Sequence, residues 1–202
     1  MTAIARMALL DLRTVAPYRK QMLAAFAVVL VLLANRPSAL VPALVLLVTS
    51  TIAAYPFQVA DKSRLETLYA VLPLPRRSVL FGHYAWALAS FLATVVAGTI
   101  VAVISARVQG EALDESSILP VAWGLFAVNV AIQFPLLIRF GYTRIGVWGT
   151  TLPLAGIVIA VVRLHVTLTS VQPWLPLAWP AGAAAIVASA LVAPAADRRR
   201  DP

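Results

Sequence analysis

Residues 61–77 read DKSRLETLYAVLPLPRR and form the longest polar interruption in a chain that is otherwise nearly all apolar. Ser63 and Glu66 have the spacing of a capping box, in which a hydroxyl and a carboxylate each accept a hydrogen bond from a backbone N–H at a helix start. The apolar residues that follow recur at helical spacing on one face: Leu65, Leu68, Tyr69 and Leu72. Pro73 and Pro75 end the pattern, because proline lacks the amide donor that a helix interior needs. The stretch predicts a short amphipathic helix, which either lies on a lipid interface or docks onto a soluble partner.

The composition is typical of a membrane protein. The 202 residues are 61% hydrophobic, whereas a soluble domain is about half apolar. The formal net charge is +8, but the arginines lie at the edges of the apolar runs, so a membrane explains the charge without nucleic acid. The chain has no cysteine, which excludes disulfides and thiolate metal sites.

The apolar runs predict an all-α polytopic membrane protein with six transmembrane helices in a single domain, residues 1–202. The predicted spans are 17–34, 38–57, 79–105, 118–138, 145–162 and 174–193. Residues 1–16 are interpreted as an interfacial amphipathic segment, and residues 58–78 as the loop that carries the short helix between spans 2 and 3.

The basic residues give this topology an orientation. Only Arg36, Arg107 and Arg163 fall in the loops of one side, and every other arginine and lysine falls on the opposite side. Because lysine and arginine are retained in the cytoplasm, both termini and the loop 58–78 are predicted to be cytoplasmic.

Polar residues inside the spans are few. Asn129 and Gln133 lie four residues apart on one face of span 4, and we expect them to make interhelical hydrogen bonds. Contact with a translocated substrate, as part of a pathway lining, is the alternative interpretation of these two residues. No charged residue falls at the centre of a span, which disfavours an ion-coupled transporter.

No pattern in the sequence indicates catalysis. His83 and His165 fall on opposite sides of the predicted membrane, so they cannot share a metal ion. Lys62-Ser63 is similar to the end of a phosphate-binding loop, but Asp61 stands where glycine is required and no glycine-rich run precedes it. We therefore expect no enzymatic activity and no bound cofactor in this chain.

Two stretches carry a family resemblance. Residues 61–66, followed by Leu68, Leu72-Pro73 and Arg76, resemble the first cytoplasmic loop of ABC-2-type exporter permeases, especially the small six-span bacterial permease subunits. Residues 134–135 and 139–144 resemble the turn between spans 4 and 5 of the same subgroup. The sequence departs from the pattern at Leu65, where tryptophan is frequent, and at the double-proline exit Leu74-Pro75.

The resemblance implies that the short helix is a coupling helix, which docks onto a separate ATP-binding-cassette ATPase dimer. The residues that it implies in docking are Asp61, Lys62, Ser63, Arg64, Leu65, Glu66, Leu68, Tyr69 and Leu72. A second cytoplasmic contact would involve Arg139, Tyr142 and Arg144. ATP and Mg²⁺ would bind the ATPase, and a second permease subunit, identical or related, would complete the pathway for an amphipathic peptide, antibiotic or lipid. The location implied is the bacterial cytoplasmic membrane.

Three alternatives remain at this stage. A substrate-capture subunit of a vitamin importer has a similar length but should show a polar ligand pocket near the outside. A membrane enzyme would need clustered Asp, His or Ser side chains facing one cavity. A membrane sensor or immunity protein without a transport role requires no particular sequence motif, so the sequence does not exclude it.

Overall fold

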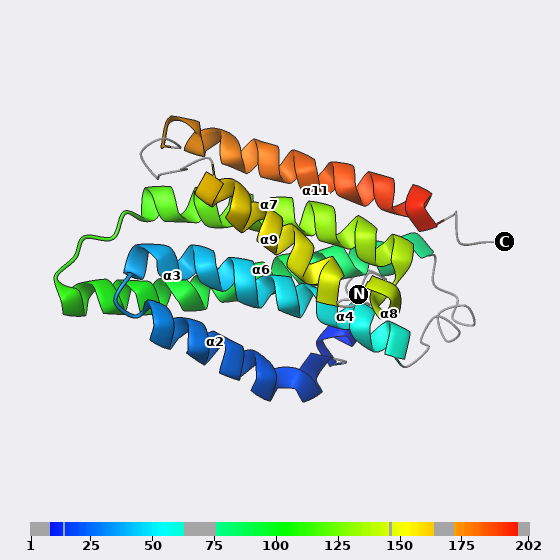
Figure 1. Ribbon diagram of the computed structural model, residues 1–202, viewed down its shortest axis with the longest axis horizontal. Helices are drawn as coiled ribbons and strands as arrows, with labels where there is room; N and C mark the ends of the chain where they lie inside the picture. The colour runs from blue at the N-terminus through cyan, green and yellow to red at the C-terminus, as the bar shows by residue number, and fades with distance from the viewer. Residues whose placement is uncertain (1–8, 14, 63–75, 146, 164–171, 198–202) are drawn as a thin grey trace.

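The computed structural model describes residues 9–13, 15–62, 76–145, 147–163 and 172–197, and these residues contain no β-strand. Most of them lie in long helices that pack side by side (Figure 1). The elements are, in chain order, η1 (Ala16–Tyr18), α2 (Arg19–Leu33), α3 (Pro37–Leu44), η2 (Val45–Thr49), α4 (Ser50–Lys62), α6 (Arg76–Gln109), α7 (Glu115–Phe140), α8 (Tyr142–Ile145), α9 (Val147–Arg163), η3 (Gln172–Trp174) and α11 (Leu175–Asp197).

Successive long helices run in alternating directions along the bundle (Figure 1). Helices α2, α6 and α9 begin at the end of the bundle where α4 ends, and α7 and α11 begin at the opposite end. We call the first of these the Lys62 end. The C-terminal ends of α4, α7 and α11 therefore lie together at the Lys62 end, as in an up-and-down membrane bundle.

The centre of the bundle is the continuous helix Pro37–Lys62, formed by α3, η2 and α4. Pro42 removes a backbone donor within α3, and the π-helical segment η2 follows directly after it. The hydroxyl groups of Ser50 and Thr51 donate to backbone carbonyls four residues earlier, inside η2. These side chains give the irregular turn additional hydrogen-bond donors within an apolar environment.

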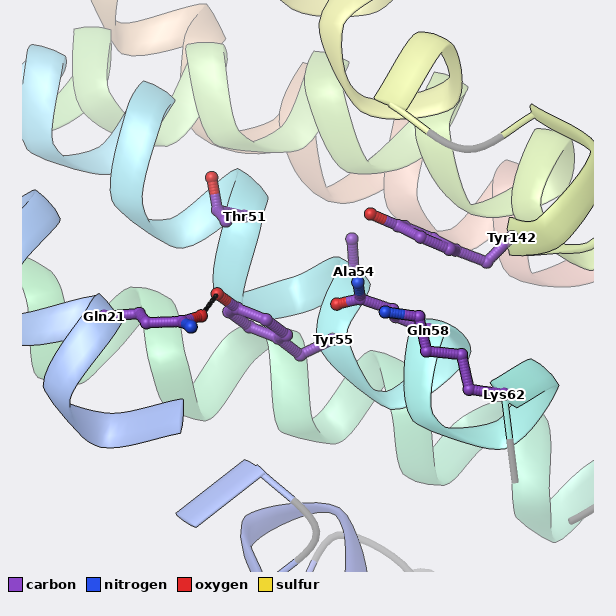
Figure 2. Close-up of a pocket in the computed structure, with 7 residues that line it drawn as sticks. All are labelled: Gln21, Thr51, Ala54, Tyr55, Gln58, Lys62 and Tyr142. Atoms are coloured by element: carbon purple, nitrogen blue, oxygen red, sulfur yellow. Dashed lines mark hydrogen bonds between the residues drawn. The ribbon is translucent and has the colours of Figure 1, made fainter. Parts of the chain in front are cut away.

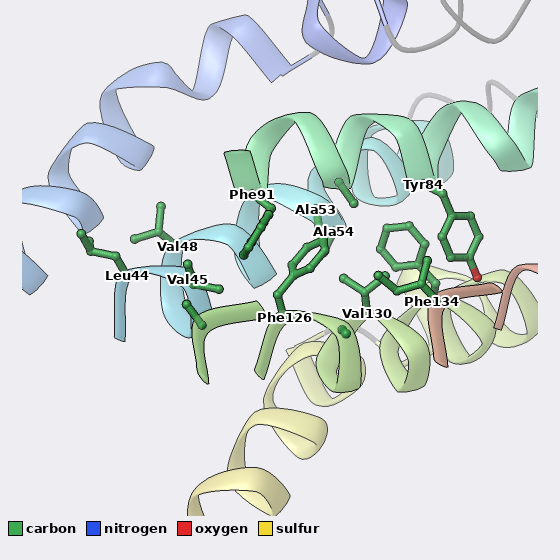
Figure 3. Packing of buried hydrophobic residues seen from close by; sticks show 14 of the residues in the cluster. Leu44, Val45, Val48, Ala53, Ala54, Tyr84, Phe91, Phe126, Val130 and Phe134 are labelled. Atoms are coloured by element: carbon green, nitrogen blue, oxygen red, sulfur yellow. The ribbon is translucent and has the colours of Figure 1, made fainter. Parts of the chain in front are cut away.

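The core lies where α3 and α4 pack against α6 and α7 (Figure 3). Leu40, Leu44 and Phe134 are completely buried there. The ring of Phe134 contacts Tyr84 and Phe57 in edge-on arrangements, with centroids 4.8 and 5.2 Å apart. Edge-to-face packing is favoured by the ring quadrupoles, so this aromatic cluster holds three helices together close to the Lys62 end.

A tryptophan compensates for a proline in α4. Pro56 has no N–H, so the carbonyl group of Ile52 lacks the donor that a regular helix would provide. The indole Nε1 of Trp86, on α6, donates to this carbonyl oxygen at 3.3 Å. The proline thus creates a free acceptor that attaches α4 to α6.

The outer surface of the bundle is covered by large apolar side chains. Those on α6 follow one face, namely Leu92, Val96, Ile100, Ile104 and Val108. A soluble monomer rarely exposes so continuous an apolar surface. In the described part of the chain, four helices are long and apolar enough to cross a membrane: Pro37–Lys62, Ser78–Gln109, Ser116–Phe140 and Gln172–Ala193. The chain is a multi-pass membrane protein.

The all-α prediction is confirmed, and four of the predicted spans coincide with these helices. The predicted spans 17–34 and 145–162 correspond to α2 and α9, which have 15 and 17 residues. At about 1.5 Å per residue each is shorter than the roughly 30 Å of hydrocarbon in a bilayer. The count of six spans therefore remains a prediction.

The two described ends of the predicted loop 58–78 are helical. Residues 58–62 extend α4 and residues 76–78 begin α6, because the polar residues there are compatible with a helix that projects beyond the lipid. The basic side chain of Lys62 also suits a helix C-terminus. The capped helix predicted after Ser63 lies outside the described residues.

Residues 9–13, within the predicted interfacial segment 1–16, are helical. Leu10 and Leu12 point outward, while Asp11 is 1% exposed. The leucines are thus available to lipid, and the acidic residue faces the bundle.

Candidate functional site

The first described residue of the predicted docking stretch, Asp61, lies beside the second predicted stretch at the Lys62 end of the bundle. Oδ2 of Asp61 accepts a hydrogen bond from the backbone N–H of Thr143 at 2.8 Å. The Thr143 hydroxyl lies 3.4 Å from the same oxygen. One carboxylate therefore joins the last turn of α4, which leads into the predicted docking stretch, to α8, which lies between α7 and α9.

Local structure explains why a distant carboxylate is needed here. Gly141 ends α7 with a φ of 74°, a conformation that glycine adopts without steric cost. It also precedes α8, whose first N–H groups have no partners within the helix. Since glycine has no side chain to cap them, Asp61 supplies the acceptor from α4.

We expect Asp61→Ala to loosen α8 without unfolding the bundle. Losing one capping acceptor costs about 1 kcal/mol, which corresponds to a roughly fivefold higher rate of hydrogen–deuterium exchange at the Thr143 amide. Hydrogen–deuterium exchange of a peptide covering residues 141–147 would measure this. Asp61→Asn retains a carbonyl acceptor and should preserve most of the protection, whereas equal exchange in wild type and Asp61→Ala would contradict the capping role.

A cavity of about 260 Å³ lies near this contact, between α2, α4 and α8 (Figure 2). Its described lining is Gln21, Thr51, Ala54, Tyr55, Gln58, Lys62 and Tyr142. The Tyr55 hydroxyl donates to Oε1 of Gln21 at 3.3 Å, which connects α4 to α2. Burial raises the pKa of the Tyr142 phenol, so this hydroxyl stays neutral and remains a hydrogen-bond donor at neutral pH. The described lining contains one cation and no carboxylate.

The remaining docking residues of the prediction are outside the described part of the chain: Ser63, Arg64, Leu65, Glu66, Leu68, Tyr69 and Leu72. Of the predicted second contact, Arg144 is exposed on α8, and Tyr142 turns toward the cavity. Arg139 is exposed in the last turn of α7, where its guanidinium lies 5.2 Å from the centroid of the Phe140 ring. The contacts of these residues with a partner remain a prediction.

Asn129 and Gln133 lie inside the bundle and contact the central helix. Nδ2 of Asn129 donates to Oγ of Ser50 at 2.8 Å and to Oε1 of Gln133 at 3.0 Å. Nε2 of Gln133 donates to the Ser50 carbonyl oxygen at 3.3 Å. The expected interhelical hydrogen bonds are therefore present, and both side chains are almost completely buried. A role in lining a pathway remains a prediction.

A buried pair of polar residues was missed in the sequence. Oδ2 of Asp11 lies 2.8 Å from Nδ1 of His83, and both side chains are buried. The His83 ring also packs 4.7 Å from the centroid of Phe57. The pair attaches the helical residues 9–13 to α6. The available signal was an acidic residue and a histidine that both fall on the predicted cytoplasmic side, within otherwise apolar segments.

The chain was compared with known proteins. The model of the ABC-2 family transporter proteins matches residues 7–193. No curated protein and no solved structure gives a significant match. The family match includes every helix from α2 to α9, α11 as far as residue 193, and the contact between Asp61 and Thr143. The chain therefore belongs to the ABC-2 family of transporter proteins.

Proposed function

We propose that this chain is the permease subunit of an ATP-binding-cassette exporter and moves an amphipathic peptide, antibiotic or lipid out of the cell. The observation that carries the proposal is the family match over residues 7–193, since the family implies an ATPase partner and a membrane location. In this proposal the chain itself is not an enzyme and binds no cofactor. ATP and Mg²⁺ bind to the separate ATPase dimer.

The proposed mechanism uses the Lys62 end as the cytoplasmic end. The coupling helix after Ser63 docks in the ATPase and moves when the ATPase dimer closes. The bond between Asp61 and Thr143 supports transmission of this movement from α4 to α8, and from there to α7 and α9. A second permease subunit, identical or related, completes the pathway, and the six predicted spans place both termini in the cytoplasm of a bacterial cell.

The docking proposal is tested by Leu68→Asp. The variant places a charge within the apolar stripe Leu65, Leu68, Tyr69 and Leu72, and a buried charge without a partner opposes binding. We expect the tagged variant to accumulate in the membrane, while the amount of ATPase that copurifies in mild detergent falls roughly tenfold or more.

Thr67→Asp is the matched control. At about 100° per residue, Thr67 lies on the opposite face of the predicted helix from the apolar stripe. The same charge should therefore leave ATPase recovery close to that of the wild type. If equal amounts of ATPase copurified with Leu68→Asp and Thr67→Asp, the docking assignment would be wrong. If no ATPase copurified with the wild type, the exporter proposal itself would be wrong.

A further inference from the structure

The cavity between α2, α4 and α8 continues a gradient of polarity along one face of the central helix. Successive residues on this face are Leu47, Thr51, Tyr55, Gln58 and Lys62, spaced at four, four, three and four positions. Leu47 is 42% exposed on the outer surface, and Lys62 is exposed at the helix end. The face therefore changes from apolar through neutral polar to cationic over about 22 Å, at about 1.5 Å per residue.

The polar groups of the cavity can recognise an anion. Figure 2 shows the Tyr142 ring reaching from α8 toward α4, across from Gln58 and Lys62. Lys62 has neither a hydrogen bond nor an ion pair with any described residue. Its ammonium group, the Tyr142 hydroxyl and the Gln58 amide provide donors from two elements, and the described lining offers no carboxylate to compete.

The size of the cavity limits what it can hold. Pockets for whole drug-sized ligands have volumes of roughly 300–1,000 Å³, and this cavity has about 260 Å³. It can therefore hold a polar head group, but a long apolar tail must lie outside it. The exposed side chain of Leu47, beyond the Thr51 side of the cavity, gives such a tail an apolar surface that faces lipid.

We propose that this cavity binds the anionic head group of an amphiphile, with Lys62 and Tyr142 contacting a phosphate or carboxylate and the tail lying along Leu47. The ligand enters between α2 and α4, where the exposed side chains of Gln21 and Thr51 line the cavity. Lys62 and Tyr142 are also among the residues that the family resemblance implies in contact with the ATPase, so the proposal is tested on the permease chain alone.

The test uses the full-length chain in detergent, without an ATPase, and native mass spectrometry with defined lipids. Phosphatidylglycerol is the anionic probe and phosphatidylcholine the zwitterionic reference. We expect the wild type to bind phosphatidylglycerol about tenfold more tightly, as a charge-assisted hydrogen bond would provide. Lys62→Gln should remove most of this preference, and Lys62→Arg should restore it. Arg13→Gln, which removes an exposed cation outside the cavity, should retain the preference.

Two further measurements separate the head group from the tail. Glycerol 1-phosphate carries the head group without a tail and should compete only at concentrations at least a hundredfold higher. Equal competition by this molecule would overturn the amphiphile assignment. Thr51→Leu fills the cavity without changing charge, and should weaken binding of both lipids. A preference that persists in Lys62→Gln, or that is absent from the wild type, would overturn the proposal.

Discussion

Gly182→Ala is expected to destabilise the chain by roughly 1–3 kcal/mol, because a methyl group at this position has no space. A Cβ atom on Gly182 would lie 2.4 Å from Nε1 of Trp123 and 3.0 Å from Cβ of Ala127. These neighbours belong to α7, along which α11 packs for much of its length. The added methyl group must therefore separate α11 from α7 or displace the indole.

The indole cannot move away without losing other contacts. Nε1 of Trp123 donates to the Trp179 carbonyl oxygen at 3.1 Å, and the two indole rings stack with centroids 5.8 Å apart. Trp123 also contacts the rings of Phe91 and Phe126. Displacement would lose a hydrogen bond and several aromatic contacts, each worth about 0.5–1.5 kcal/mol.

Gly156→Ala is the matched control. Gly156 is also inside a helix, but no heavy atom lies within 4 Å of the position that its Cβ would take. Alanine should therefore leave stability unchanged or raise it by up to about 1 kcal/mol, as expected from helix propensity. Thermal unfolding of both variants in the same detergent measures the difference. Equal midpoints would show that α11 does not pack on α7 as described.

The glycines show where sequence reasoning reaches its limit. Gly98-x-x-x-Ala102 and Gly156-x-x-x-Ala160 have the same small-residue spacing, which permits close approach of helices. Only the first is used within the described chain, where a Cβ on Gly98 would lie 3.1 Å from Cδ1 of Leu44. The spacing of small residues predicts where another helix can pack closely, but it does not identify that helix, which depends on long-range packing.

The same distinction applies to the candidate site. Residue periodicity was enough to predict the all-helical membrane fold, and the charge of Asp61 marked the end of the apolar run. Its bond to Thr143 depends on the turn at Gly141, which brings α8 beside α4. Likewise, the acceptor that Trp86 uses exists only because Pro56 removes a helical donor. These contacts join residues that are far apart in the sequence, so no local pattern could assign them.

The buried amides of α7 should show strong energetic coupling. Asn129→Leu leaves Oε1 of Gln133 without its donor, and Gln133→Leu removes one of the two acceptors of Asn129 Nδ2, each at a cost of about 1–3 kcal/mol. Measured values within membranes are nearer the lower limit, since helices that remain inserted after unfolding find other partners. We therefore expect each single variant to lose about 1–2 kcal/mol of stability.

The double variant Asn129→Leu with Gln133→Leu should lose less than the sum of the two single losses, because it removes the donor and the acceptor together. The surrounding Val130 and Phe134 are buried and apolar, so leucine side chains are compatible with the site. A double-mutant cycle of unfolding in detergent measures the coupling, and Ser189→Ala, distant from Asn129 in the hydrogen-bond pattern, serves as an uncoupled control. Strict additivity would show that the 3.0 Å contact contributes nothing to stability.

In the exporter proposed above, transport by the double variant distinguishes the two roles considered for these residues. If the amides only hold α7 against the central helix, the double variant should regain both stability and export relative to the single variants. The reason is that the two leucine side chains then pack in place of the hydrogen-bonded amides. If they also line the pathway, the stable double variant should export its cargo more slowly than the wild type, because the polar groups that receive the cargo are gone. Reconstituted export must therefore be compared at temperatures where both proteins are fully folded, so that only the loss of the amide groups separates them.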